Sequence, residues 1–317
     1  GASLVIAYPI GRWLRGGMRS VPLFELICLY LFLAHCPERV MPGRLLADLS
    51  GMSRVVGGVT PAATELAAEL YRHVVGGDLD LTDALTAEIV KTGENAYRDV
   101  QIAFANEMAL LCESLGADVW KVRELLIKSP GRAMLLPGGG VGGHCIPKDP
   151  WLLVSGAGPA FEPRLVAAAR AINDGMPQHV ASLVVAALAR CGRSVGSSRV
   201  AVLGASYLED SDDDRNAPTA SLVHRLVDLG ADVAVSDPWV PRYRESSLES
   251  CVTGADAVVV MVAHQVYRDL DLPRLRGLAR SPVLVDARRC IDPGAAAAAG
   301  WSLVTLGVGT APLPTGG

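Results

Sequence analysis

The sequence lacks the cysteine and histidine spacings that mark a disulfide framework or a metal site. Its seven cysteines are scattered from Cys28 to Cys290 without a CxxC pair, and its six histidines are dispersed as well. This pattern indicates reduced thiols in a cytoplasmic protein and no metal. An excess of charge is also missing. The net charge of -4 over 317 residues gives no reason to expect nucleic acid or an anionic membrane as a partner.

The sequence has no hydrophobic run long enough to cross a bilayer. Residues 22–34 are apolar apart from Glu25 and follow three arginines, so they mimic the core of a signal peptide. Because the run is too short to span a membrane, we interpret it as a buried strand or helix. The alternative is a membrane or export segment.

A dinucleotide-binding fingerprint, in which a strand leads through GxGxxG into a helix, is absent from the first 60 residues. Gly138, Gly140 and Gly143 match the spacing of the glycines, but a proline precedes them and two more follow. We therefore reject a dinucleotide site there. Gly204 follows an apolar run but has no companion glycines. This pattern favours at most the binding of a diphosphate near the start of the next helix.

What the chain does have is a glycine-rich stretch, residues 136–150, that contains one cysteine and one acid. Cys145 follows the glycines, and Asp149 comes four residues later behind a proline. Glycines let the backbone approach a ligand closely, and a cysteine in such a setting is a candidate nucleophile. The alternative is a glycine-rich turn with a buried, inert cysteine. A protease-like pair with His144 is excluded, because adjacent side chains diverge.

Lys91 and Asn95 lie four residues apart in a segment with helical periodicity, so they share one helix face. A lysine can keep a nearby thiolate ionised, and the two together can stabilise an oxyanion. The alternative is a solvated face on which Glu88 pairs with Lys91.

Helical patterns dominate the middle of the chain. Thr60-Pro61 is typical of a helix start, and Leu66, Leu70 and Val74 continue that helix at the right spacing. The further helices that we expect cover residues 82–115, 118–129 and 163–190, the last bent or broken near Pro177.

From residue 199 strands alternate with helices, which predicts a parallel sheet covered by helices. The expected strands are residues 200–203, 232–236, 257–262 and 283–285, with helices at 217–229 and 295–299. Residues 2–7 and 32–35 are candidate strands of the N-terminal part.

Taken together, these motifs resemble the UDP-glucose/GDP-mannose (nucleotide-sugar) 6-dehydrogenase family. The matching stretches are residues 35–43, 54–59, 88–91 with Asn95, 104–107, 138–150, 202–204, 212–213 with Arg215 and Pro218, 236–238, 255–258 and 286–288. His144 and Ile146, which flank the cysteine, resemble the branch that oxidises UDP-N-acetylhexosamines, above all UDP-N-acetyl-D-mannosamine. Tyr207-Leu208 is in keeping with that branch.

The resemblance implies two successive oxidations of an alcohol by NAD, with the intermediate aldehyde bound to Cys145 and released as an acid through a thioester. It implies that Lys91 and Asn95 stabilise oxyanions and that Asp149 and Glu38 move protons and position water. The resemblance also implies that Arg288 binds the cofactor. The implied substrate-binding residues are Arg132, Gly138, Gly140, Gly142, Gly143 and Arg215.

The fold class implied is α/β, with three parts. Residues 1–58 are expected to be a remnant of an NAD-binding Rossmann domain, residues 59–178 a helical central domain that forms a homodimer, and residues 179–317 a Rossmann-like UDP-binding domain. Because the first part carries little of a cofactor domain, we expect the chain to bind a UDP-sugar without binding NAD or forming NADH. The alternative function is a non-catalytic remnant that binds UDP-sugar or pairs with a longer relative. Alternative substrates are UDP-N-acetyl-D-glucosamine and UDP-glucose.

Overall fold

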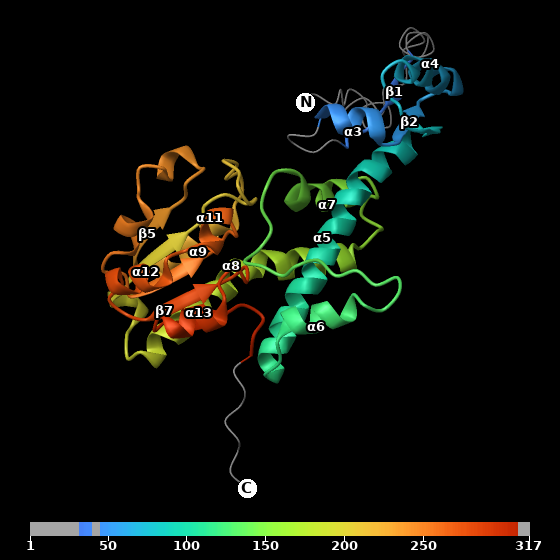
Figure 1. The fold of residues 1–317 in the computed structure, drawn as a ribbon. Helices are drawn as coiled ribbons and strands as arrows, with labels where there is room; N and C mark the ends of the chain where they lie inside the picture. The colour runs from blue at the N-terminus through green and yellow to red at the C-terminus, as the bar shows by residue number, and fades with distance from the viewer. Residues whose placement is uncertain (1–31, 40–44, 310–317) are drawn as a thin grey trace. The chain divides into compact units, whose positions relative to one another are not determined.

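The computed structural model describes residues 32–39 and 45–309 (Figure 1). The expected strand at residues 2–7 and most of the apolar run 22–34 lie outside these residues. The chain divides into two compact units, Gly1–Asn95 and Ala96–Gly317, and the long helix α5 (Ala84–Leu115) contributes to both. Within the described residues, no helix is both long and apolar enough to cross a membrane. The three-part division expected at residues 58 and 178 stays a prediction.

The first unit contains a small mixed sheet. Its elements are β1 (Ala34–His35), α3 (Leu45–Gly51), β2 (Arg54–Gly58), α4 (Pro61–Arg72) and β3 (Leu79–Asp83), with the start of α5. β2 pairs antiparallel with β1 and parallel with β3. The parallel pair was not predicted, because β3 is largely exposed and carries two aspartates in five residues.

Helix α4 begins where the sequence predicts. The Thr60 side chain accepts a hydrogen bond from the Ala63 N–H (3.2 Å), and Pro61 occupies the first turn. The face that packs is formed by smaller residues, namely Ala63, Thr64 and Ala68. The apolar repeat of Leu66, Leu70 and Val74 is exposed.

The second unit starts with the remainder of α5 and the helices α6 (Val119–Leu126), α7 (Cys145–Ser155) and α8 (Arg164–Arg190). We expected a bend or a break near Pro177, and the structure excludes the break, since α8 runs through this residue. Pro177 is buried, and a Cβ added at Gly140 would lie 3.2 Å from its Cδ. We attribute the tolerance of this proline to packing on the glycine-rich stretch, which offsets the missing backbone hydrogen bond.

The remainder of the second unit is a five-stranded parallel sheet with the order β5-β4-β6-β7-β8. Four of its strands lie where the sequence predicts them, and β8 was missed. The elements are β4 (Arg199–Leu203), α9 (Pro218–Asp228), β5 (Asp232–Ser236), α10 (Leu248–Val252), β6 (Ala257–Val260), α11 (Gln265–Arg268), α12 (Leu272–Leu278), β7 (Val283–Asp286), α13 (Pro293–Ala298) and β8 (Ser302–Thr305).

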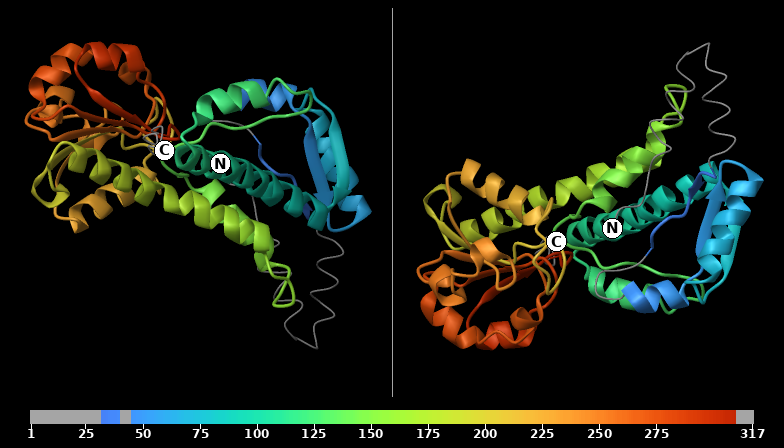
Figure 2. Two further views of the ribbon diagram at one scale, coloured as in Figure 1. Left: turned by 90° about the horizontal axis from the view of Figure 1, so that it is seen from below. Right: turned by 90° about the horizontal axis from the view of Figure 1, so that it is seen from above.

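Helices cover both faces of this sheet (Figure 2). Val200 and Val202 of β4 belong to a core with α8 and α9, whereas Ala201 and Leu203 belong to a second core with α10, α12 and α13. Successive side chains of a strand point to opposite faces, so an uninterrupted apolar run fills both layers. The predicted α/β class is confirmed.

Candidate functional site

A small, partly open pocket lies at the carboxyl ends of β4 and β6 in the second unit. Ser206 and Tyr207 line it after β4, Met261 and Val262 line it after β6, and Pro218 at the start of α9 closes one side. β4 pairs with β5 on one side and with β6 on the other. The chain therefore leaves β4 towards one edge of the sheet and leaves β6 towards the other edge. Such a switch point is where open α/β sheets bind ligands.

The glycine-rich stretch borders this pocket and is held from both sides. The Gly138 N–H donates to Asn106 Oδ1 (2.9 Å), and the Asn106 amide donates to Asn173 Oδ1 (2.9 Å). At the other end the Gly143 N–H donates to the Arg215 carbonyl (2.8 Å), and Asn216 Nδ2 donates to the Gly143 carbonyl (3.0 Å). Backbone groups of the stretch are thereby fixed by α5, α8 and the segment before α9.

Close packing explains glycine at position 142. A Cβ at Gly142 would lie 2.5 Å from Tyr207 Cβ and 2.9 Å from the Asn216 carbonyl oxygen. Neither contact can be relieved by rotating a side chain, because the backbone fixes the positions of a Cβ atom and a carbonyl oxygen alike.

Cys145 is exposed and begins α7. The buried position that we considered as an alternative for this cysteine is therefore excluded. The argument that the prolines prevent a helix after the glycines is wrong, since Pro147 falls in the first turn, where the missing N–H has no partner to lose. Asp149 follows one turn later on the same helix face and is buried, with an ion pair to Lys148 (3.0 Å).

Two polar side chains, Tyr207 and Arg215, interact with Cys145, and Asp213 pairs with Arg215. Arg215 Nε and Nη2 donate to the two carboxylate oxygens of Asp213 at 2.8 and 2.5 Å, and these hydrogen bonds lower the pKa of Asp213. Burial raises the pKa of the Tyr207 hydroxyl, and the neighbouring Asp213 raises it further. Both Tyr207 and Arg215 are close enough to Cys145 to interact with its charge.

Arg288 lines the pocket from the loop after β7. Its Nη2 atom lies 3.2 Å from Glu209 Oε1, and a Cβ at Gly138 would lie 2.4 Å from its Nη1 atom. Arg132, in contrast, is exposed after α6 and outside the residues that line the pocket.

The first unit brings together two other expected site residues. Lys91 donates from Nζ to the Glu38 carbonyl, and the Glu38 carboxylate pairs with the buried Arg54 (3.0 Å). Asn95 lies one turn after Lys91 on α5 and is half-buried. That Lys91 and Asn95 converge with Cys145 and Asp149 on one pocket, as the resemblance implies, stays a prediction.

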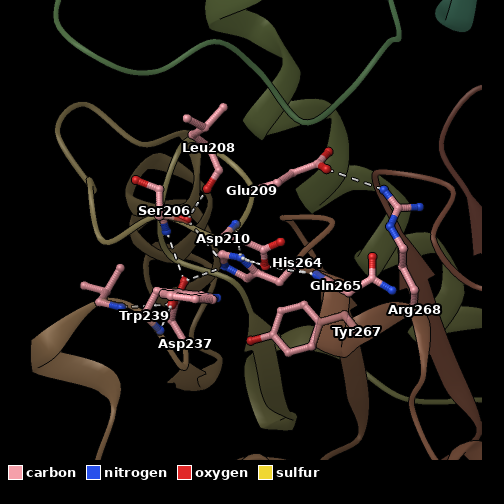
Figure 3. Close-up of polar contacts among 12 residues, drawn as sticks. Ser206, Leu208, Glu209, Asp210, Asp237, Trp239, His264, Gln265, Tyr267 and Arg268 are labelled. Carbon is pink, nitrogen blue, oxygen red and sulfur yellow. Dashed lines mark hydrogen bonds and ion pairs between the residues drawn. The ribbon is translucent and has the colours of Figure 1, made fainter. Parts of the chain in front are cut away.

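A buried clamp that the sequence analysis missed holds the loop after β4 (Figure 3). The Asp237 carboxylate accepts backbone N–H groups from both its own loop and the loop after β4, and His264 Nε2 lies 3.1 Å from Asp237 Oδ2. His264 Nδ1 accepts the Asp210 N–H (2.8 Å), so its proton is on Nε2. Ser206 Oγ approaches the same nitrogen (3.4 Å). A catalytic triad would need the serine and the acid on different nitrogens.

The chain matches two domain models of one family. The central domain of the UDP-glucose/GDP-mannose dehydrogenase family matches residues 85–175, and the UDP binding domain of that family matches residues 201–293. The UDP-N-acetyl-D-mannosamine dehydrogenase of Methanococcus maripaludis is 34% identical over 292 residues, which is 90% of this chain and 67% of that protein.

Solved structures that are similar to this chain include two nucleotide-sugar dehydrogenases. The UDP-D-ManNAc dehydrogenase from Pyrococcus horikoshii has a TM-score of 0.82 at 40% identity, covering 87% of this chain and 65% of its own. The NDP-N-acetyl-D-galactosaminuronic acid dehydrogenase from Methanosarcina mazei has a TM-score of 0.83 at 38% identity, covering 88% of this chain and 62% of its own. The chain thus spans about two thirds of the length of these relatives. With both domain models matched in order, it belongs to the UDP-glucose/GDP-mannose dehydrogenase family.

Proposed function

We propose that this chain binds a UDP-N-acetylhexosamine, with UDP-N-acetyl-D-mannosamine favoured, and provides the thiol on which the sugar alcohol is oxidised to a uronic acid. The observation that carries the proposal is the exposed Cys145 at the start of α7, behind a glycine-rich stretch that is fixed beside the switch-point pocket. The names of the relatives support an N-acetylated amino sugar as the substrate.

The chemistry assigned to Cys145 begins once the alcohol carbon has become an aldehyde. The Cys145 sulfur adds to that carbon and forms a thiohemiacetal, which loses a hydride to become a thioester. Water then cleaves the carbon–sulfur bond, releasing the acid and the thiol. Asp149 and Glu38 are proposed to move protons and position the water, and Lys91 with Asn95 to stabilise the oxyanions.

NAD is proposed as the hydride acceptor in both oxidations. Arg288 offers a guanidinium suited to a phosphate at the pocket, so the residues present fit one part of such a ligand. Within the described residues, no strand leads through a GxGxxG turn into a helix. The part assigned to this chain in cofactor binding is therefore limited to the Arg288 contact.

The substrate-binding group is proposed to include Arg215 and the glycine-rich stretch, with Arg132. The Arg215 guanidinium is exposed and held by Asp213, and its geometry is suited to a diphosphate. UDP-N-acetyl-D-glucosamine and UDP-glucose are the alternative substrates, and binding without catalysis is the alternative function.

Protection of thiols from iodoacetamide tests the proposal on the chain as it is. Cys145 and Cys191 are both exposed, which makes Cys191 a matched internal control. We expect saturating UDP-N-acetylmannosamine to slow alkylation of Cys145 several-fold and to leave Cys191 unchanged, as measured by mass spectrometry of the peptides. Equal alkylation of Cys145 with and without the ligand contradicts the proposal.

Adding NAD to the same mixture distinguishes catalysis from binding alone. Formation of two NADH per sugar that disappears in Cys145→Ala supports the dehydrogenase. Protection of Cys145 without NADH supports the non-catalytic alternative. UDP-glucose in a parallel arm tests the preference for the N-acetylated sugar.

We also infer that the chain forms a homodimer through α5. Tyr97, Phe104 and Leu111 are exposed at intervals of seven residues, which places them on one side of the helix. Large apolar side chains in a continuous stripe are typical of an interaction surface. The likeness to the family supports a second copy of this chain as the partner.

A further inference from the structure

Glu209 is an acidic side chain in the wall of the pocket in which we place an anionic ligand. It lines the pocket together with Arg288, and its Oε1 atom lies 3.2 Å from Arg288 Nη2. Its other oxygen, Oε2, lies 3.5 Å from Arg268 Nη2 (Figure 3). One carboxylate therefore contacts two guanidinium groups, of which Arg288 lines the pocket and Arg268 lies outside its lining.

The backbone beside Glu209 is fixed by the buried clamp. Asp210 adopts a left-handed conformation (φ 51°), which is unusual for a residue other than glycine. Its N–H donates to His264 Nδ1 (2.8 Å), and its Oδ1 atom accepts the Gln265 N–H (3.0 Å). Because these contacts over-determine the backbone, Glu209 can change its contacts by rotating its side chain while the loop stays in place.

The ion pair between Glu209 and Arg288 is weak enough to be exchanged. Their side chains are 39% and 27% exposed, so solvent screens the interaction. A diphosphate offers more charge and more acceptor oxygens to a guanidinium than one carboxylate does. Arg268 provides a second contact for the displaced carboxylate, which reduces the cost of the exchange.

We propose that Glu209 is an internal counterion of Arg288, and that a phosphate group of the bound nucleotide displaces it and takes over this guanidinium. Glu209 then sets the affinity of the pocket for anions and prevents Arg288 from binding small anions unselectively. This inference rests on the proposed binding of a nucleotide at the switch-point pocket. The shared chemistry is a phosphate ester, which both a UDP-sugar and NAD contain.

Calorimetric titrations of the 317-residue chain with UDP in one arm and NAD in the other test the inference. We expect Glu209→Gln to tighten the binding of at least one probe about two- to fivefold, the range that a half-exposed ion pair permits. Arg288→Gln should weaken binding of that probe, and adding Glu209→Gln to Arg288→Gln should have no further effect. The arm that responds identifies which phosphate takes over Arg288.

The matched control is Glu249→Gln, which changes a glutamate of similar exposure, 43% against 39%, that pairs with Arg274 (3.2 Å) outside the pocket lining. It should leave both affinities unchanged. Unchanged or weaker binding by Glu209→Gln, with the wild type still binding UDP, overturns the counterion role alone. Failure of every variant, Glu209→Gln included, to bind either probe overturns the inference together with the proposed nucleotide site.

Discussion

Asp237 is fully buried, and its carboxylate accepts several hydrogen bonds. Its ionisation should therefore affect the free energy of unfolding. Burial alone would raise its pKa, but hydrogen bonds from His264 and from the backbone N–H groups of Ala205, Val240 and Trp239 outweigh burial, and the pKa is lowered strongly. A carboxyl group with a lowered folded-state pKa stabilises the fold above its unfolded-state pKa, near 3.9. That contribution is lost as the pH falls towards the folded-state value.

For Asp237→Asn we expect a loss of about 1–3 kcal/mol in the free energy of unfolding at pH 7, because several buried N–H groups lose a charged acceptor. The difference from the wild type should stay constant down to about pH 5 and narrow below about pH 4. Urea unfolding at pH 7, 5 and 3.5 measures it, with Asp232→Asn as an exposed control. A difference that does not change with pH contradicts the role of the carboxylate charge.

The single residues that sequence reasoning found are those whose chemistry is visible without a partner. Cys145 and Asp149 stand out because a thiol follows a run of glycines and an acid follows it by one helical turn. Glu209 and His264 were missed, because each acts through residues 27 to 79 positions away in the chain. A left-handed Asp210 leaves no distinct mark in the sequence either.

The glycine-rich stretch before α7 should tolerate a side chain very differently from the end of that helix. Gly142→Ala forces a Cβ against Tyr207 and the Asn216 backbone, so we expect it to reduce the free energy of unfolding by about 1–3 kcal/mol and to weaken UDP binding. Gly156→Ala is the matched control, since a Cβ there meets nothing within 4 Å. Chemical denaturation and UDP titration of the two variants measure both effects. Equal stability and equal UDP affinity of the two variants would show that the glycine-rich stretch accommodates a side chain without loss.

Whether an element could be predicted depended on how its apolar residues are distributed. β4 to β7 are short apolar runs between helices, so their positions were recognisable. β3 exposes most of its residues, and β8 has only two apolar residues, Leu303 and Val304, so neither has a distinctive pattern. α7 and α8 contain prolines whose cost depends on packing, and local sequence does not report packing.

The dimer that we infer depends on the exposed stripe of α5. Phe104→Glu places a charge in the middle of that stripe, so we expect it to shift a dimer to monomers, because a buried unpaired charge is costly. Val227→Glu on α9 is a control at a similarly exposed apolar position, 53% against 50%. Sedimentation velocity at micromolar concentration distinguishes the species. A wild-type chain that sediments only as a monomer contradicts the inferred dimer.

The fold class was predictable because it depends on the whole pattern and not on any single boundary. Strands that alternate with helices require a parallel sheet with both faces covered, and the two cores of the second unit meet that requirement. The convergence of Lys91 with Cys145 rests on the family resemblance and stays a prediction. It depends on long-range packing, for which the sequence carries no local signal.

Gly138 and Arg288 are tied to each other through the space that they share. The atoms nearest to a Cβ at Gly138 all belong to the Arg288 side chain, at 2.4 to 3.5 Å. A methyl group at position 138 therefore displaces the guanidinium, whereas a shorter side chain at position 288 removes the obstacle. We therefore expect the two positions to covary in descendants of this chain, because a side chain at position 138 requires the Arg288 guanidinium to move and the loss of the arginine removes that requirement.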